Sequence, residues 1–280
     1  MERNTAKRTL EKLLSVCICL CMLGAMLPAQ VFAEEADTAQ TETVQDTAPK
    51  DTVHLSSADD LIQLAKNCRL DSWSQNRTVV LEADVDLSSV DFNGIPSFGG
   101  TWEGQNHAIT GLSLSQDGSV QGLFRYVQQG ALVRDMTVKG RIKPGGTRAS
   151  VGGIAGSNAG TIENCAFDGV VSGTSQIGGI AGVNTVKGSI NGCTVSGTVY
   201  GSHFVGGVVG QNDGVAANCT NVASVNTTVS QNEVKLNDLT LDNVLKTEKA
   251  NDVTDAGGIA GNNAGVLRAC INRGTIGYSH

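Results

Sequence analysis

The sequence GGIAGSN at 152–158 recurs three times, as GGIAGVN at 178–184, GGVVGQN at 206–212 and GGIAGNN at 257–263. Each copy is followed by a further glycine, and a cysteine comes five residues after that glycine. The starts of successive copies are 26, 28 and 51 residues apart. Repeats of roughly 20–50 residues are typical of solenoids, propellers and other stacked arrays.

The composition of the repeat excludes most of these architectures. Three glycines in five residues would destabilise a helix by about 1 kcal/mol each, which excludes helical repeats. A propeller blade needs about 40–45 residues, and a calcium-binding β-roll needs an aspartate that no copy contains. We therefore predict an all-β fold, a right-handed parallel β-helix with one repeat per turn and about five turns over 121–280. Each turn would stack on the next at about the 4.8 Å spacing between strands.

Two columns of the repeat have clear tasks in a parallel β-helix. The apolar column is expected to point inward and form one row of the core. The asparagine column is expected to form a ladder of side-chain amides that bond from turn to turn. The apolar column comprises Ile154, Ile180, Val208 and Ile259, and the asparagine column comprises Asn158, Asn184, Asn212 and Asn263.

The last spacing of 51 residues is about two periods, but it holds only one copy. We therefore predict that 226–255 is an insertion that leaves the solenoid as a short helix or hairpin. Insertions into repeats often carry the binding face. A weaker copy precedes the four clear ones, with Gly122-Leu123-Phe124 aligned to the Gly-Gly-Ile step and Met136 in the cysteine column.

The cysteine column is predicted to be a buried row of reduced thiols. A position that accepts methionine or cysteine is apolar and interior, because a buried free cysteine behaves as a small hydrophobe. Disulfides between neighbouring turns are the alternative, since an exported protein meets oxidising conditions. Zinc is disfavoured, because there is no C-x-x-C motif and no histidine nearby. The column comprises Cys165, Cys193, Cys219 and Cys270.

The N-terminal residues 1–33 have the pattern of a secretory signal peptide. Basic residues precede an apolar run from Leu13 to Leu27, Pro28 interrupts it, and a small residue, Ala33, stands at the expected cleavage position. The mature chain would begin at Glu34. Residues 34–52 are acidic and contain one large apolar residue, Val44, so we predict a disordered acidic linker.

Residues 53–120 lack the repeat and are predicted to form an N-terminal cap with the first irregular coils. Ser57 and Asp60 form the start of a helix, and Leu61, Leu64 and Cys68 then share one helical face. A solenoid end exposes unpaired backbone, and a helix lying across the first coil would cover it.

One segment carries a more specific resemblance. Residues 98–114, FGGTWEGQNHAITGLSL, resemble the F-x-G-x-(F/W)-(D/E)-G-x-x-H-x-I-x-x-L segment of the GLUG-motif repeat family of bacterial surface proteins. The Gly122-Leu123-Phe124 step, the repeats and the Ser57-Ala58-Asp59-Asp60-Leu61 helix start are similar to the same family. The resemblance covers about 53–280.

This resemblance implies a right-handed β-helix on secreted or wall-attached proteins, some of which carry it ahead of a peptidase module, as in immunoglobulin-A-type metallopeptidases. The chain contains no HExxH motif, so the resemblance implies no peptidase activity. It implies instead that the chain is the N-terminal piece of a larger protein.

A catalytic constellation is not found in the sequence. Lyases and hydrolases built on β-helices need carboxylates that converge on one face, which in a solenoid means one column in adjacent turns. Two columns near the cysteines each contain one carboxylate, and neither column repeats it. These columns are Glu163, Asn191, Ala217 and Arg268, and Asp168, Ser196, Val222 and Arg273. We therefore predict no catalytic, cofactor-binding or metal-binding residues in this chain.

The sequence favours a non-catalytic, secreted or cell-surface module that acts as an adhesion or display stalk. The alternative is the N-terminal non-catalytic part of a secreted peptidase or polysaccharide-degrading enzyme. The net charge of −7 argues against nucleic acid as a partner. The expected partner is an unidentified surface protein or glycan, and any membrane attachment would need an anchor outside these residues.

Overall fold

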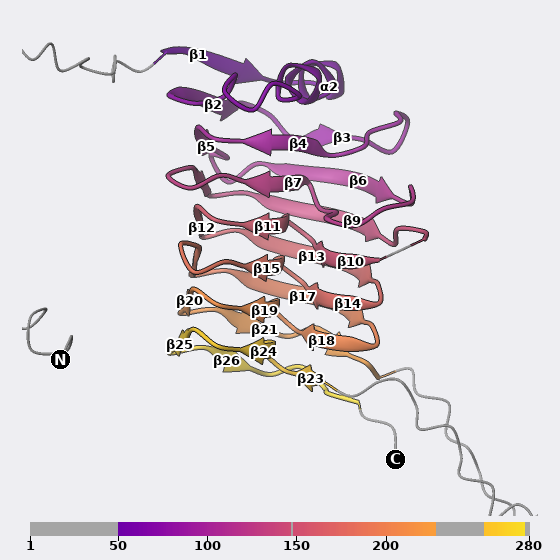
Figure 1. Ribbon diagram of the computed structural model, residues 1–280. Coiled ribbons are helices and arrows are strands. Elements are labelled where there is room, and N and C mark those ends of the chain that lie inside the picture. The colour runs from indigo at the N-terminus through magenta and orange to yellow at the C-terminus, as the bar shows by residue number, and fades with distance from the viewer. Residues whose placement is uncertain (1–49, 147, 228–254, 278–280) are drawn as a thin grey trace, which may run out of the picture. The chain divides into compact units, whose positions relative to one another are not determined.

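The computed structural model describes residues 50–146, 148–227 and 255–277, which form one continuous stack of coils (Figure 1). The predicted signal peptide lies outside the described residues, as do residues 34–49 of the predicted linker and residues 228–254 of the predicted insertion. No helix in the described ranges is long and apolar enough to cross a membrane.

Four parallel sheets run along the stack. Sheet A contains β1 (Lys50–Leu55), β2 (Arg77–Leu81), β5 (Thr101–Glu103), β8 (Leu132–Arg134), β12 (Thr161–Glu163), β16 (Ser189–Asn191), β20 (Val215–Ala217) and β25 (Val266–Arg268). Sheet B contains β3 (Val85–Asp86), β6 (Ala108–Leu114), β9 (Thr137–Ile142), β13 (Ala166–Ser172), β17 (Thr194–Tyr200), β21 (Thr220–Asn221) and β26 (Ile271–Asn272), with β22 (Ser224–Val225) also paired to β17.

Sheets C and D complete each turn. Sheet C contains β4 (Ile95–Phe98), β7 (Phe124–Val127), β11 (Ala155–Asn158), β15 (Ala181–Asn184), β19 (Val209–Asn212) and β24 (Ala260–Asn263). Sheet D contains β10 (Ala149–Gly152), β14 (Ser175–Gly178), β18 (His203–Gly206) and β23 (Ala256–Gly257). The predicted all-β parallel solenoid is confirmed. The five strands from β7 to β24 correspond to the five turns expected over 121–280.

The repeats stack in register across the long spacing as well as the short ones. Asn184 pairs with Asn212, and Asn212 pairs with Asn263, although 51 residues separate the last two. The third and fourth copies are therefore direct neighbours in the stack, and the predicted insertion 226–255 falls between them in the chain. The mainly apolar interior of each coil cannot be buried by that coil alone, so the stack is the unit of stability.

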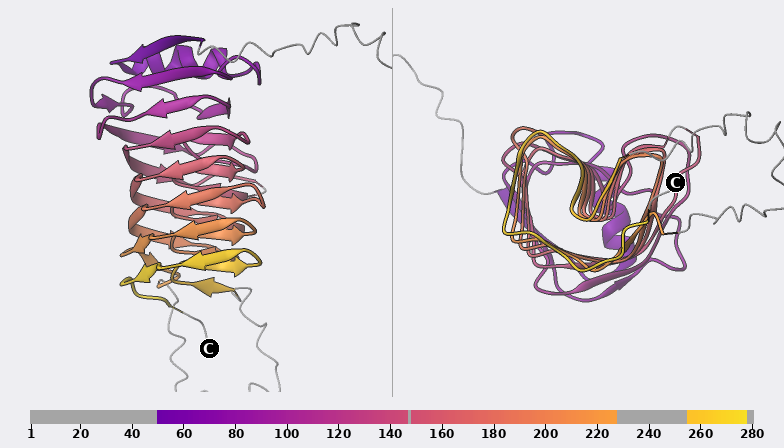
Figure 2. Two further views of the ribbon diagram at one scale, coloured as in Figure 1. Left: turned by 90° about the vertical axis from the view of Figure 1, so that its left-hand side faces the viewer. Right: turned by 90° about the horizontal axis from the view of Figure 1, so that it is seen from below.

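The predicted cap helix is present as α2 (Ala58–Asn67). The Ser57 hydroxyl accepts a hydrogen bond from the Asp60 backbone N–H at 3.2 Å, which satisfies one of the free N–H groups of the first turn. Leu61 and Leu64 are buried against the first coils. Seen along the axis in Figure 2, α2 lies within the outline of the coils, where it covers the N-terminal end of the stack.

The coils are not simple rings, because each folds inward on one side (Figure 2). The Gly152-Gly153 step joins β10 to β11 at a sharp turn. A side chain at Gly182 would collide with the backbone of Ser150 and Val151 in the preceding coil. The third glycine of each GGxxG therefore allows sheet C of one turn to approach sheet D of the turn before.

The asparagine ladder is present and buried. Asn158 donates from Nδ2 to Oδ1 of Asn184 at 2.8 Å, Asn184 donates to Asn212 at 2.8 Å, and Asn212 donates to Asn263 at 2.7 Å. The first three are fully buried, whereas Asn263 is exposed on the last coil. Each buried amide also reaches a backbone carbonyl, so burial leaves the amide well hydrogen-bonded.

The cysteine row is also confirmed as interior and is continuous with Met136. Successive backbone hydrogen bonds link Met136, Cys165, Cys193, Cys219 and Cys270 at equivalent positions of five coils. The first four are buried, and Cys270 is half-buried in the last coil. All five cysteines of the described residues, including Cys68, are free thiols.

Burial governs the chemistry of this row. It raises the pKa of the Cys165 thiol to about 12, because the thiolate is poorly solvated there. Burial has the same effect on Cys68, which lies outside the row at the end of α2, and raises its pKa to about 11. The thiols of Cys193 and Cys219 also contact each other through a side-chain hydrogen bond. That contact raises the pKa of Cys193 and lowers that of Cys219 to about 7.

The structure differs from the sequence-based predictions at two boundaries. Strand β1 begins at Lys50, inside the segment predicted as linker. Phe124 pairs with Ala155, and Leu123 therefore occupies the Ile154 column that was predicted for Phe124. Gln121 pairs with Val151, and Phe124 pairs with Ala155. The inward turn between these two pairs is therefore one residue shorter in the coil of Gln121 than in the coil of Gly152-Gly153.

Candidate functional site

The predicted columns of Glu163 and Asp168 are present in the structure, because their residues pair in register from coil to coil. Glu163 pairs with Asn191, Asn191 with Ala217, and Ala217 with Arg268 along sheet A. On the other side, Glu163 lies next to Arg134 in register. Glu103 lies in the same column on the other side of Arg134 and binds that guanidinium through two hydrogen bonds. The two carboxylates are therefore separated by Arg134, and this arrangement does not supply the paired acid and base of glycoside cleavage.

The second column has the same character. Asp168 pairs with Ser196 in one direction and with Lys139 in the other along sheet B. The described carboxylates of these two columns therefore alternate with basic or neutral residues from coil to coil.

The three described histidines lie apart, each beside a carboxylate. His54 is 2.6 Å from Glu82, His107 is 3.1 Å from Asp84, and His203 is 3.5 Å from Asp255. In the part of the chain that the structure covers, no three His, Cys, Asp or Glu side chains are placed to hold a metal ion.

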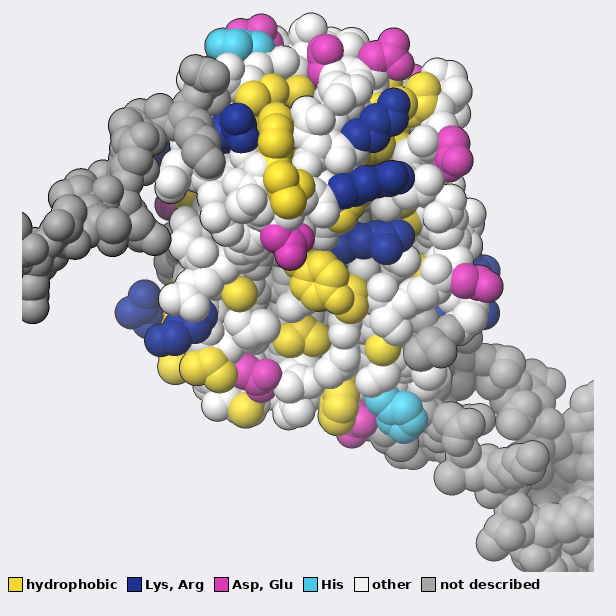
Figure 3. Space-filling view, turned by 45° about the horizontal axis from the view of Figure 1, so that its top comes forward, with side chains coloured by type: hydrophobic (Ala, Val, Ile, Leu, Met, Phe, Trp, Pro, Cys, Tyr) yellow, Lys and Arg dark blue, Asp and Glu magenta, His cyan; other side chains and the backbone are white. Residues whose placement is uncertain are grey.

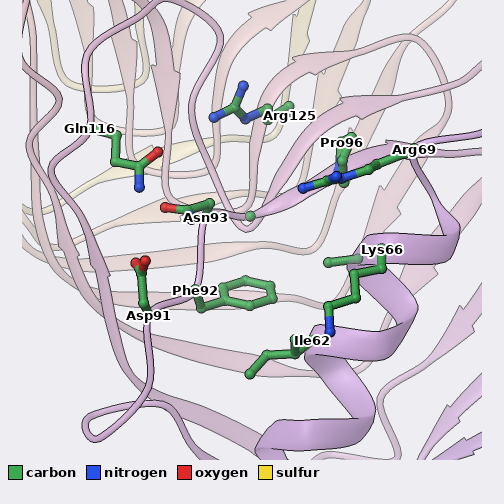
Figure 4. A pocket seen from close by; sticks show the side chains of 11 residues that line it. Ile62, Lys66, Arg69, Asp91, Phe92, Asn93, Pro96, Gln116 and Arg125 are labelled. Atoms are coloured by element: carbon green, nitrogen blue, oxygen red, sulfur yellow. The ribbon is translucent and has the colours of Figure 1, made fainter.

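A pocket with a volume of about 370 Å³ lies instead between the cap helix and the first coils. Figure 4 shows the side chains that line it, which come from α2 and the residues just after it, from the loop that precedes β4 and β4 itself, from Gln116 after β6, and from β7. Its lining residues are Ile62, Ala65, Lys66, Arg69, Asp91, Phe92, Asn93, Gly94, Pro96, Gln116 and Arg125. This volume is at the lower end of the range of small-molecule sites, about 300–1,000 Å³.

The pocket concentrates positive charge in an acidic chain. Lys66, Arg69 and Arg125 line it, with Asp91 as the one lining carboxylate. None of the three cations has a carboxylate within 4 Å in the described ranges, unlike Arg134, which binds Glu103 through two hydrogen bonds. On the face shown in Figure 3, Lys and Arg side chains gather toward the N-terminal end of the solenoid.

The walls of the pocket are held by the fold. Phe92 is buried in the core, and Ile62 and Ala65 pack against that core from α2. Gly94 has φ +78°, and a side chain there would approach the Gly122 carbonyl, so a glycine is needed for the loop to close on β7. These contacts mean that the pocket is formed before any ligand arrives.

No motif or spacing in the sequence indicates this pocket. Lys66 and Arg69 are three residues apart near the end of a predicted helix, where cations are common because they offset the helix dipole. Arg125 lies 56 residues further on, directly after Gly122-Leu123-Phe124 of the weaker repeat copy. Only the stacking of α2 on the first coils brings these side chains together.

Comparison with solved structures finds a similar fold in a protein from Bacteroides ovatus, described as a "putative immunoglobulin A1 protease". The two share a TM-score of 0.50 and 17% sequence identity, with 78% of this chain and 74% of that chain covered. The resemblance to the β-helix region of immunoglobulin-A-type peptidases is thus confirmed at the level of the fold.

Comparison with curated proteins finds halomucin from Haloquadratum walsbyi, which is 28% identical over 128 residues. The match covers 40% of this chain and 1% of halomucin, so the chain spans a very small part of that protein. A scan against models of protein families finds no match.

Proposed function

We propose that this chain is a non-catalytic, extracellular β-solenoid module that holds a binding surface away from the cell, as an adhesion or display stalk. The observation that carries the proposal is the uninterrupted axial register of the coils, from β4 to β24 in sheet C. A rod in which every coil bonds to the next resists bending, and rigidity is what a spacer needs.

Other features agree with this role. The signal-like residues 1–33 favour export. In the columns of Glu163 and Asp168, each carboxylate has a basic or neutral residue as its neighbour in the next coil. The Bacteroides ovatus protein shares the solenoid fold, and the halomucin match relates the chain to 1% of the length of that protein.

The alternative role is that of a non-catalytic part of a secreted peptidase or polysaccharide-degrading enzyme. The fold of the Bacteroides ovatus protein favours it. The two roles agree that these residues bind and do not cleave, and they differ in what the rest of the protein does.

Incubation of the purified chain with immobilised pectin, hyaluronan, peptidoglycan and casein tests the proposal. We expect retention on at least one of them, without release of products. Product release that is lost on Glu163→Gln or Asp168→Asn would overturn the non-catalytic assignment. Failure to be retained on any surface polymer or on whole cells would overturn the adhesion role.

A further inference from the structure

We propose that the pocket between α2 and the first coils binds an acidic sugar, a ring that carries a carboxylate. This inference rests on the proposed function and names the chemical class of its ligand. Three kinds of group in the pocket carry it: unpaired cations, amides with one carboxylate, and an apolar surface.

The cations supply the first part of the recognition. Lys66 from α2, Arg69 from the chain just after α2 and Arg125 from β7 line one pocket without a carboxylate partner in the described residues (Figure 4). The helix dipole accounts for Lys66 in the last turn of α2, but it does not account for Arg125, which lies on another element. Arg125 is half-buried, so part of its hydration is already lost before a ligand binds. A guanidinium in that position favours a carboxylate, with which it forms paired hydrogen bonds.

The remaining polar groups match hydroxyls better than a second charge. Asn93 and Gln116 offer both donors and acceptors, and Asp91 offers acceptors only. Asp91 would repel a ligand with several carboxylates, such as an acidic peptide. A ligand with one carboxylate and several hydroxyls can satisfy the cations, the amides and Asp91 together.

The apolar part of the lining suits the face of a sugar ring. Ile62 and Ala65 on the helix and Pro96 at the start of β4 line the same pocket as the charged groups. The small volume of about 370 Å³ fits a ring or a short end of a glycan and does not fit a long polymer segment. The pocket is also built of packed elements, so little ordering opposes binding.

Calorimetric titration of the full chain tests this inference directly. The probes are glucuronic acid, galacturonic acid and N-acetylneuraminic acid. Glucose, which has the ring but no carboxylate, is the control for charge, and glutamate, which has carboxylates but no ring, is the control for the ring. We expect one acid sugar to bind with one-to-one stoichiometry, more weakly at higher salt, and glucose and glutamate to bind at least about tenfold more weakly. Oligogalacturonate and sialyl-lactose then distinguish a plant-type or microbial polyuronate from a sialylated glycan as the source.

Substitutions assign the binding to the pocket. Arg125→Gln and Arg69→Gln should each weaken binding by about tenfold or more, as expected for the loss of a charge-assisted hydrogen bond. Lys187→Gln removes an exposed cation on a distant turn and should change nothing. The melting temperature should stay the same for all three, because none of these side chains has an ion-pair partner in the described structure.

Several results would overturn the inference. These are binding of no acid sugar, equal binding of glucose or glutamate, and unchanged affinity in Arg125→Gln. If Arg125→Gln is still retained on surface polymers as the parent chain is, the acidic-sugar pocket is wrong while the adhesion role stands. If the parent chain is retained on nothing but binds a free acid sugar, the adhesion role is wrong and the pocket stands.

Discussion

The side-chain amide of Asn184 donates to the side-chain oxygen of Asn212 at 2.8 Å, although 28 residues separate them in the chain. Both side chains are fully buried, and each also contacts backbone carbonyls. This bond links one coil to the next through the interior, where water does not compete for it. The ladder is therefore a structural cross-link between turns.

The first prediction concerns this ladder. Asn184→Ala should lower the free energy of unfolding by about 2–4 kcal/mol, because it leaves the buried amide of Asn158 without its acceptor and removes the bond to Asn212. Asn263→Ala is the matched control in the same column, and it should cost less because Asn263 is exposed. Chemical denaturation followed by circular dichroism measures both. Equal losses in the two variants would show that burial of the ladder does not matter.

The second prediction concerns the inward fold of the coil. Gly182→Ala places a methyl group against the backbone of Ser150 and Val151, which cannot move away as a side chain could. We expect a loss of about 1–3 kcal/mol, as for other overpacked positions. Gly130→Asn is the control, because no atom lies within 4 Å of a side chain there and asparagine tolerates its positive φ. A melting temperature unchanged by Gly182→Ala would contradict the close approach of sheets C and D.

The third prediction concerns the thiol row. Cys165, Cys193 and Cys219 should not react with iodoacetamide in the native protein, whereas half-buried Cys270 should react slowly and measurably. The main reason is that iodoacetamide cannot reach thiols inside the stack. In addition, burial raises the pKa of Cys165 to about 12, so almost no thiolate forms at neutral pH. Peptide mapping by mass spectrometry assigns each label. Rapid labelling of Cys193, or a disulfide between two members of the row, would contradict the buried reduced state.

The fourth prediction concerns the start of α2. Ser57→Ala should cost about 1 kcal/mol, because it removes the N-cap hydrogen bond to Asp60. The Ser56 backbone N–H and the Ser57 hydroxyl both donate to the Asp60 carboxylate, and they lower its pKa. Because the pKa of Asp60 is lower in the folded than in the unfolded chain, the hydrogen bonds to its carboxylate stabilise the fold fully above the unfolded pKa of about 3.9. That stabilisation is lost as the pH falls through the lower pKa of the folded chain.

The acid limb of the stability profile tests the same cap. In Ser57→Ala the Asp60 pKa should rise toward its ordinary value, and the difference in stability from the parent chain should shrink below about pH 4. Carbon-detected NMR titration of Asp60 follows the pKa directly. An Asp60 titration that is identical in the two proteins would show that Ser57 does not hold the carboxylate.

The fifth prediction concerns the insertion. Replacing 228–254 by Gly-Ser would leave 26 residues between the third and fourth copies, which is the spacing of the first two. Because Val225 and Ala256 already occupy their places in sheets B and D, the shortened chain should keep the circular dichroism of a β protein. Its melting temperature should fall by no more than a few degrees. Loss of cooperative unfolding would show that the insertion supports the last coil.

The repeat allowed much of the stack to be predicted, because equivalent residues of a solenoid must lie above one another. The buried Ile154 column, the asparagine ladder and the cysteine row follow from that single condition. The sequence did not indicate a second side-chain amide pair between coils, in which buried Asn221 donates to exposed Asn272 at 2.8 Å. The same column holds Phe167 and Val195 in earlier coils, so no repeat of asparagine marked it as a ladder.

The sequence by itself determined the fold class, the register of the repeats and the cap helix, because each depends on spacing along the chain or on a local capping pattern. The tertiary structure alone decided the pocket. Its residues come from α2, from the loop before β4, from Gln116 and from β7, with no common spacing. Their distances are set by how a non-repeating cap packs on the first coils, and a one-dimensional pattern carries no information on that packing.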